Sequence, residues 1–257
     1  MPVVLLLGDS HARQMHLAHC RLHNGSHRFD GRGPLGDMAG VCRSDHATAR
    51  WMFETWMGSA RLGRIADQLE SSNRIVGAPS AIWTNGLLWD LMYYQMFAAD
   101  DDPTARALYG AHPLAPPESA AVHRVVREYA AGVARYVQEL VRLAGSVPVT
   151  WLTTHAVASS PCVGRYVPRA PSDALAHARR REANESLPRL CRTFFWPDVI
   201  ARMNREAVRA ARSKGARVFH VQSALRGAAR SEYLQDDGVH LRDAHADRVF
   251  SSALRAD

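Results

Sequence analysis

A serine hydroxyl follows the first apolar run of the chain. Residues 3–7 are all apolar, and Gly8-Asp9-Ser10-His11 comes directly after them and leads into a helix-like stretch. A small, flexible residue at the end of a strand lets the chain turn sharply, which exposes the hydroxyl beside the amides of a helix N-terminus. The pattern therefore predicts a nucleophile at Ser10. The alternative for Ser10 is an ordinary helix N-cap, a position that favours serine.

An acid and a base stand close together near the other end of the chain, in Asp237-Gly238-Val239-His240. Serine is a weak nucleophile at neutral pH, so it needs a neighbouring base, and that base needs a partner that orients it. His240 and Asp237 meet both needs for Ser10 if the two ends of the chain come together. The alternative is a turn at Asp237-Gly238 with His240 as a surface residue.

Short apolar runs alternate with long periodic segments, a pattern typical of a parallel sheet with crossover helices. Strands are expected at residues 3–7, 81–84, 147–153 and 217–221, with another between residues 29 and 42. Helices are expected at residues 11–23, 48–70, 118–144, 197–213 and 243–254. The segments 98–117 and 155–197 fit no element, and we expect them to lie beside the strand ends and wall a cleft.

These elements predict one α/β domain over residues 1–257, a three-layer α/β/α sandwich with a central parallel sheet of flavodoxin-like type. In a doubly wound sheet of this kind, the carboxyl ends of the strands meet along one edge. The loop after the last strand can then bring Asp237 and His240 to Ser10.

Composition excludes several classes of function. No apolar run approaches the roughly 20 residues that cross a bilayer, so no membrane span is expected. The run at residues 3–7 lacks a basic start, so we interpret it as a strand and not as a signal peptide; the protein is then cytoplasmic or a domain of a longer secretory-pathway protein. The net charge of +7 is nearly all arginine, with Lys214 the only lysine, and no aromatic residues are interleaved with it. We expect no nucleic-acid partner.

The cysteines and clustered histidines do not predict a metal site or a cofactor. The four cysteines have no CxxC spacing, which argues against zinc. Their even number permits two disulfides in any of three connectivities, but buried free thiols are the favoured interpretation. They are Cys20, Cys42, Cys162 and Cys191. Histidines 16, 19 and 23 share a helical face, yet no carboxylate completes a site there.

The order of the two motifs, GDS after a first strand and DxxH near the end, resembles the SGNH (GDSL-like) hydrolase superfamily. Residues 201–241 are similar to the C-terminal third of that superfamily. Ser10-His11-Ala12-Arg13 departs from the GDSL form and is closer to the PC-esterase branch, which includes trichome-birefringence-like polysaccharide acetyltransferases. In that branch an arginine stands three residues after the serine, as Arg13 does here. Residues 83–91 also resemble a segment of the branch, although the spacing is not identical.

The resemblance implies roles for particular residues. Ser10, Asp237 and His240 would form the catalytic triad. The oxyanion would be bound by Asn85, the Ser10 amide and a glycine amide from residues 33–40. The candidate for this glycine is Gly36. Candidate substrate-binding residues are Asp9, His11, Arg13 and Trp89. Asn85-Gly86 is also a turn signal in its own right, and a tryptophan such as Trp89 among leucines is often a core residue.

The implied function is a serine-dependent esterase that acts on O-acyl esters, above all O-acetyl esters of carbohydrate, through an acyl-enzyme on Ser10. One alternative is an O-acetyltransferase with the same triad, in which a sugar hydroxyl replaces water. Another is a non-catalytic carbohydrate-binding protein on the same fold, since fold does not fix function. The expected partner is a small-molecule or glycan ester, and the sequence leaves the oligomeric state open.

Overall fold

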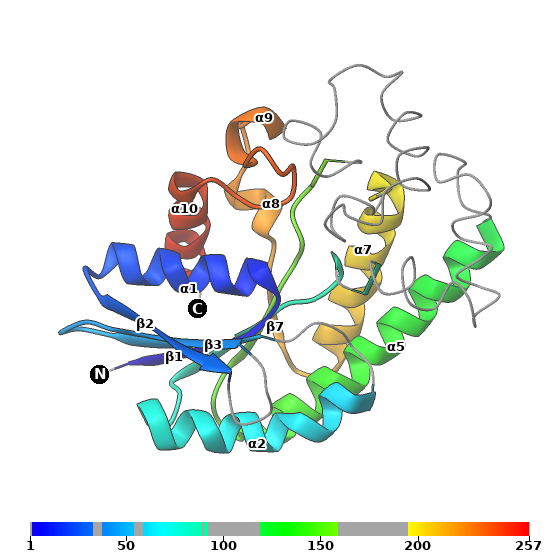
Figure 1. Cartoon of the computed structure of the whole chain (residues 1–257). Coiled ribbons are helices and arrows are strands. Elements are labelled where there is room, and N and C mark those ends of the chain that lie inside the picture. Colours follow the sequence, from blue (N-terminus) through cyan, green and yellow to red (C-terminus); the bar gives the residue numbers. More distant parts are fainter. Residues whose placement is uncertain are drawn as a thin grey trace.

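A seven-stranded sheet runs through the centre of the described part of the chain (Figure 1). The computed structural model describes residues 2–32, 38–53, 59–88, 90–91, 119–158 and 195–256. The strand order is β2-β3-β4-β1-β5-β6-β7. The strands are β1 Val3–Gly8, β2 Ser26–Arg32, β3 Met38–Arg43, β4 Thr48–Phe53, β5 Ala81–Thr84, β6 Val149–Leu152 and β7 Arg217–Phe219.

The direction of the strands creates a crevice beside β1. Strands β1, β5, β6 and β7 are parallel to one another, as expected, and β4 is also parallel to β1. Strands β2 and β3 form an antiparallel pair at one edge. Two strands therefore stand where one was predicted between residues 29 and 42. After β1, the chain adds β2, β3 and β4 on one side of it and then crosses to the other side, where β5 pairs with β1. Ligands of open α/β sheets bind at such a switch point, outside the carboxyl ends of the strands.

The helix predicted at residues 48–70 is wrong in its first part. Residues Thr48–Phe53 form strand β4, and helix α2 occupies Ser59–Val76. Strand β4 pairs with both β1 and β3, and its side chains are buried on both faces, Ala49 and Trp51 on one and Met52 on the other. A strand buried on both faces lacks a period of two, so its apolar run is easily joined to the periodic pattern of the next helix.

Helices cover both faces of the sheet and complete the expected three layers (Figure 1). Side chains alternate along β1, so that Val4 and Leu6 belong to one core and Leu5 and Leu7 to the other. The first core is closed by α1 Ser10–Leu22, α8 Val221–Ala224 and α10 Asp243–Leu254. The second is closed by α2, α5 Ser119–Ala144 and α7 Pro197–Ser213. A short helix, α9 Arg230–Tyr233, lies between α8 and α10 in the chain. No helix among the described residues is long and apolar enough to cross a membrane.

A disulfide fastens helix α1 to the sheet. Cys20 in the last turns of α1 is bonded to Cys42 of β3, with 5.6 Å between the Cα atoms. The interpretation of these two residues as free thiols is therefore wrong, because the close approach of α1 to β3 is a tertiary contact that cysteine spacing does not encode. Cys162 and Cys191 lie outside the described residues. The bond steadies the helix whose first residue is Ser10.

Two histidines of α1 are buried beside this disulfide. The exposed fractions of His16 and His19 are 0% and 1%, and none of their ring nitrogens has a hydrogen-bond partner among the described residues. Burial lowers the pKa of His16 to about 3 and that of His19 to about 4, so both rings are neutral at pH 7. In the described ranges no group of three or more His, Cys, Asp or Glu side chains is arranged to hold a metal ion.

Protonation of His16 should weaken the fold as the pH falls. Its folded-state pKa lies below the unfolded value of 6.5, so its stabilisation is complete above pH 6.5 and is lost as the pH falls toward 3. For this one group, linkage gives a loss of about 2 kcal/mol between pH 7 and pH 5. Urea unfolding at the two pH values should therefore show a smaller loss for His16→Leu than for the parent. The exposed His46→Gln is the control, and equal losses in the parent and His16→Leu would contradict the prediction.

Candidate active site

The two ends of the chain meet at the carboxyl edge of the sheet, as the sequence predicts. The amide side chain of Gln14 in α1 donates to the carbonyl of Leu241 (2.7 Å) and accepts from its backbone N–H (3.1 Å). Ser10 follows β1, and the loop that carries Asp237 and His240 comes after β7 and α9. These paired bonds fix that loop against the first turns of α1.

Asp9, and not Ser10, caps helix α1. The Asp9 carboxylate accepts a hydrogen bond from the backbone N–H of His11 at 2.9 Å, and Ser10 is the first residue of the helix. The interpretation of Ser10 as the N-cap is therefore wrong. Among the described residues no hydrogen bond engages the Ser10 hydroxyl, which stands partly exposed at the helix N-terminus. A hydroxyl placed there is close to amide groups that favour a developing negative charge.

Asp237 and His240 form a short, charge-assisted pair. The Nδ1 atom of His240 lies 2.5 Å from Oδ2 of Asp237, and Oδ1 accepts the backbone N–H groups of Val239 and His240, each at 2.9 Å. Burial alone would raise the pKa of Asp237, but the bonds from the His240 side chain and the two amides outweigh it and hold this pKa below its usual range. The ionised carboxylate makes Nδ1 of His240 the donor, which leaves Nε2 as the candidate base.

The His240 ring faces the first turn of α1. Its centroid lies 5.8 Å from that of His11, the residue after Ser10, in an edge-on arrangement. No hydrogen bond joins the Ser10 hydroxyl to His240. Catalytic hydrogen bonds are often long before a substrate binds and tighten in the reacting complex. The arrangement brings the nucleophile, base and acid predicted from the sequence to one place, and their catalytic roles remain a prediction.

The Asn85 side chain packs against the turn that carries Ser10. It follows β5, is 2% exposed, and its Nδ2 donates to Oδ1 of Asp9 at 2.7 Å. Its backbone N–H donates to the carbonyl of Leu7 (3.2 Å), and its side chain lies directly against Gly8. Asn85 therefore depends on both residues that precede Ser10, and it does not form the turn of a hairpin. The Asp9 carboxylate is engaged by its two donors, and a substrate contact for Asp9 stays a prediction.

The backbone just beyond Asn85 is strained. Leu87 is fully buried and has a φ of 132°, a region that favours glycine. The Asp90 carboxylate accepts its N–H at 3.1 Å and holds this conformation. Strain of this kind persists where the surroundings over-determine it, which is common at functional sites.

His155 is a site residue that the sequence did not predict. It follows β6 and is 2% exposed, and its Nε2 lies 2.8 Å from the carbonyl oxygen of Val239. Nε2 of His11 approaches the same oxygen at 3.3 Å, and the two ring centroids are 4.5 Å apart. Burial lowers the pKa of both histidines, that of His155 well below its ordinary value. A signal for His155 was available, because it stands two residues after the strand predicted at residues 147–153. The prediction instead placed it at the start of the long segment 155–197.

The remaining predicted residues lie further out. Arg13 is exposed, and its guanidinium carbon lies 5.9 Å from the ring centroid of the buried Trp51. A contact between Arg13 and substrate stays a prediction. Gly36 and Trp89 lie outside the described residues, so their predicted roles in the oxyanion hole and in substrate binding also stay predictions.

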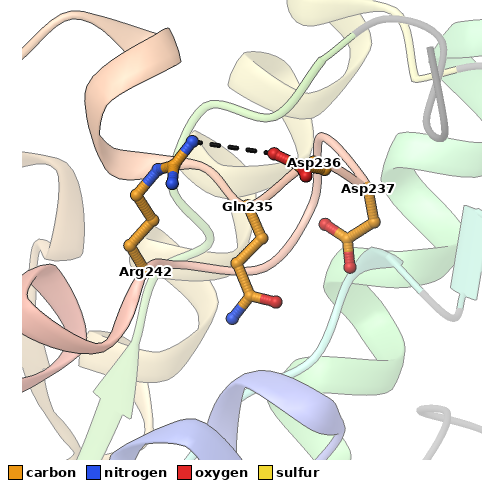
Figure 2. A pocket seen from close by; sticks show the side chains of 4 residues that line it. All are labelled: Gln235, Asp236, Asp237 and Arg242. Atoms are coloured by element: carbon orange, nitrogen blue, oxygen red, sulfur yellow. Dashed lines mark ion pairs between the residues drawn. The ribbon is translucent and has the colours of Figure 1, made fainter. Parts of the chain in front are cut away.

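A polar pocket of about 420 Å³ opens beside Asp237, the predicted catalytic acid (Figure 2). It is lined by Gln235, Asp236, Asp237 and Arg242. The side chains of Arg242 and Asp236 point toward each other, with 3.7 Å between the nearest nitrogen and oxygen. Asp237 thus contacts His240 and also lines the pocket. All four of these lining side chains are polar or charged.

The chain is similar in fold to solved structures of SGNH type. A protein assigned as a GDSL-like lipase from Parabacteroides merdae matches with a TM-score of 0.50 and 10% identity over 100% of this chain and 96% of its own. The periplasmic domain of a lipopolysaccharide acetyltransferase from Salmonella ser. Paratyphi A matches with a TM-score of 0.49 and 9% identity over 99% and 82%. A lipase/acylhydrolase from Enterococcus faecalis matches with a TM-score of 0.46 and 12% identity over 100% and 95%.

At these identities the likeness shows the fold, and it confirms the expected α/β/α sandwich of SGNH type. No protein-family model matches the sequence, and no curated protein matches it significantly. The finer resemblance to the PC-esterase branch stays a prediction.

A methyl group at Gly8 should displace Asn85. A Cβ there would overlap Oδ1 of Asn85 and lie 3.0 Å from the Cβ of Ala12. Overpacking of this kind costs about 1–3 kcal/mol, so Gly8→Ala should lower the free energy of unfolding by that amount. The cost should be smaller in an Asn85→Gly background, where the clash is relieved. Urea unfolding of the four proteins of this cycle measures the difference, and the same cost in both backgrounds would refute the coupling.

Proposed function

We propose that the protein is a serine-dependent esterase that acts on O-acyl esters of carbohydrate through an acyl-enzyme on Ser10. The observation that carries the proposal is the Asp237–His240 pair, with its 2.5 Å contact, on a loop that Gln14 of helix α1 bonds at Leu241, next to His240. A base oriented by an ionised acid beside an unengaged hydroxyl is the arrangement that acyl transfer requires.

In the proposed reaction, Nε2 of His240 accepts the Ser10 proton as Oγ attacks the ester carbonyl. The backbone N–H of Ser10, the N-terminus of α1 and the Asn85 amide stabilise the tetrahedral oxyanion. Collapse of this intermediate expels the alcohol, which takes the proton from His240. Water then attacks the acyl-enzyme, again with His240 as the base, and releases the acid and free Ser10.

The polar pocket supports a carbohydrate as the alcohol part of the substrate. Carboxylate, guanidinium and amide groups pair with hydroxyls, whereas they would leave an acyl chain of a lipid without apolar contacts. The pocket shares Asp237 with the proposed triad, so a sugar held there lies beside the reacting ester. The Cys20–Cys42 disulfide favours an oxidising compartment as the place of action over the cytoplasm.

Substitutions in the proposed triad should strongly reduce ester hydrolysis and leave the fold intact. Ser10→Ala and Asp237→Asn should each reduce kcat on p-nitrophenyl acetate by about 10³–10⁴-fold, because one removes the nucleophile and the other removes the charge that orients His240. Steady-state kinetics and thermal unfolding measure the two effects. Ser213→Ala, an exposed serine at the end of α7, is the matched control. Turnover by Ser10→Ala at the parent rate would refute the serine mechanism.

Arg242 should discriminate sugar esters from simple esters. Loss of one charge-assisted hydrogen bond to a hydroxyl corresponds to about a tenfold change in affinity. We therefore expect Arg242→Ala to raise KM for acetylated xylo-oligosaccharides about tenfold and to leave p-nitrophenyl acetate hydrolysis unchanged. Arg248→Ala, an exposed arginine of α10, is the control.

Equal effects of Arg242→Ala on both substrates would argue against a sugar subsite. Product analysis in the same assay distinguishes release of acetate from transfer of acetyl to a second sugar, which would identify a transferase.

A further inference from the structure

We propose that His11 and His155 form a histidine clamp on the Val239 carbonyl, and that His155 is the positioning residue that fixes His240 as the base for Ser10. The proposal rests on the proposed function. The clamp is the pair of Nε2 contacts to one oxygen, at 3.3 Å from His11 and 2.8 Å from His155. Val239 directly precedes His240, so a constraint on its carbonyl acts on the peptide that carries the base.

The chemistry of the clamp fixes the state of both rings. A carbonyl oxygen only accepts, and its two lone pairs serve two donors, so each Nε2 must carry a proton. The exposed fractions of His11 and His155 are 8% and 2%, and burial disfavours their charged forms. Both rings are therefore neutral Nε2–H tautomers. The same tautomer would not serve a general base or a metal ligand at Nε2, which makes positioning the role that fits these contacts.

His155 is itself held from two sides. Asn204 of α7 accepts the N–H of Thr154 at 3.1 Å and donates to its carbonyl at 2.8 Å. The Thr154 hydroxyl donates to the carbonyl of Gly86, next to Asn85, at 3.2 Å. The segment that presents His155 is thus tied to α7 and to the candidate oxyanion loop.

The same segment contacts the base loop at a second point. The Ala158 N–H donates to the carbonyl of Gly238 at 2.8 Å, one residue before the clamped carbonyl. With Val239 held, the N–H groups of Val239 and His240 are directed at Oδ1 of Asp237, 2.9 Å away. Release of the carbonyl would let this peptide rotate and would misalign the acid and base with each other and with Ser10.

Two substitutions separate the donor from the bulk of His155. His155→Phe keeps the ring volume and loses the N–H, whereas His155→Gln keeps an N–H donor at a similar reach. We expect His155→Phe to lower kcat on p-nitrophenyl acetate by about 10–100-fold with KM within about twofold, because misplaced catalytic groups lose rate more than binding. His155→Gln should restore kcat to within about threefold of the parent.

A proton NMR measurement makes the test independent of activity. The hydrogen bond between Asp237 and His240 should give a far-downfield proton resonance in the parent and in His155→Gln, and that resonance should be lost or displaced in His155→Phe. His19→Phe, at another buried histidine of α1, is the matched control and should keep both the resonance and kcat. Thermal unfolding of each variant verifies that it folds.

The outcomes separate the clamp from the esterase proposal. An unchanged resonance in His155→Phe, or equal losses of kcat in the Phe and Gln variants, would overturn the clamp. Absence of ester hydrolysis by the parent would instead overturn the proposed function, and the NMR comparison would still decide whether His155 positions His240.

Discussion

The candidate site depends on the bonds that hold the C-terminal loop to the start of helix α1. Both the amide nitrogen and the amide oxygen of Gln14 hydrogen-bond to the backbone of Leu241, and the His11 ring contacts the Val239 carbonyl. The start of one helix therefore holds the loop that presents His240. The residues joined in this way are more than 220 positions apart in sequence, as the separations of 227 and 228 residues show. Closing so long a loop is entropically costly, and the packing of the sheet formed by the intervening residues offsets that cost. The Cys20–Cys42 bond joins α1 to β3 and keeps this helix in place.

The residues around Ser10, the proposed nucleophile, are structurally coupled to one another. Gly8 leaves room for the Asn85 side chain, and Asp9 both caps α1 and accepts a hydrogen bond from Asn85. The turn that exposes Ser10 and the side chain proposed to bind the oxyanion are thus parts of one small structure at the switch point between β1 and β5. This explains why the residues before Ser10 are glycine and aspartate: one has no Cβ, and the other is a short acceptor with two oxygens.

The sequence predicted the parts of the fold and site that local pattern encodes. The apolar run of β1, the helices α5, α7 and α10, and the places of Ser10 and Asp237–His240 all follow from periodicity, caps and motif position. Strand β4 was missed because burial on both faces removes the alternation that identifies a strand. The Cys20–Cys42 bond was missed because it depends on a contact between a helix and a strand. The N-cap, which was considered for Ser10 only as an alternative to a nucleophile, is Asp9, because serine and aspartate are both good caps and only the backbone geometry decides between neighbours.

The neutrality of the clamp bears on the charge that the proposed reaction creates. When His240 takes the Ser10 proton it becomes an imidazolium, and Asp237 is placed to stabilise that charge. A second positive charge on His11, whose ring centroid is 5.8 Å from that of His240, would oppose it by about 3 kcal/mol at an effective dielectric constant of 20. Burial of His11 and His155 prevents this repulsion, because it keeps both rings uncharged while their N–H groups still bind Val239. A lysine or arginine would hold the same carbonyl equally well, but its fixed charge would oppose the imidazolium in every catalytic cycle. Buried histidine gives the site a donor of aromatic size without that charge, and this is the physical reason to find two such rings beside the proposed base.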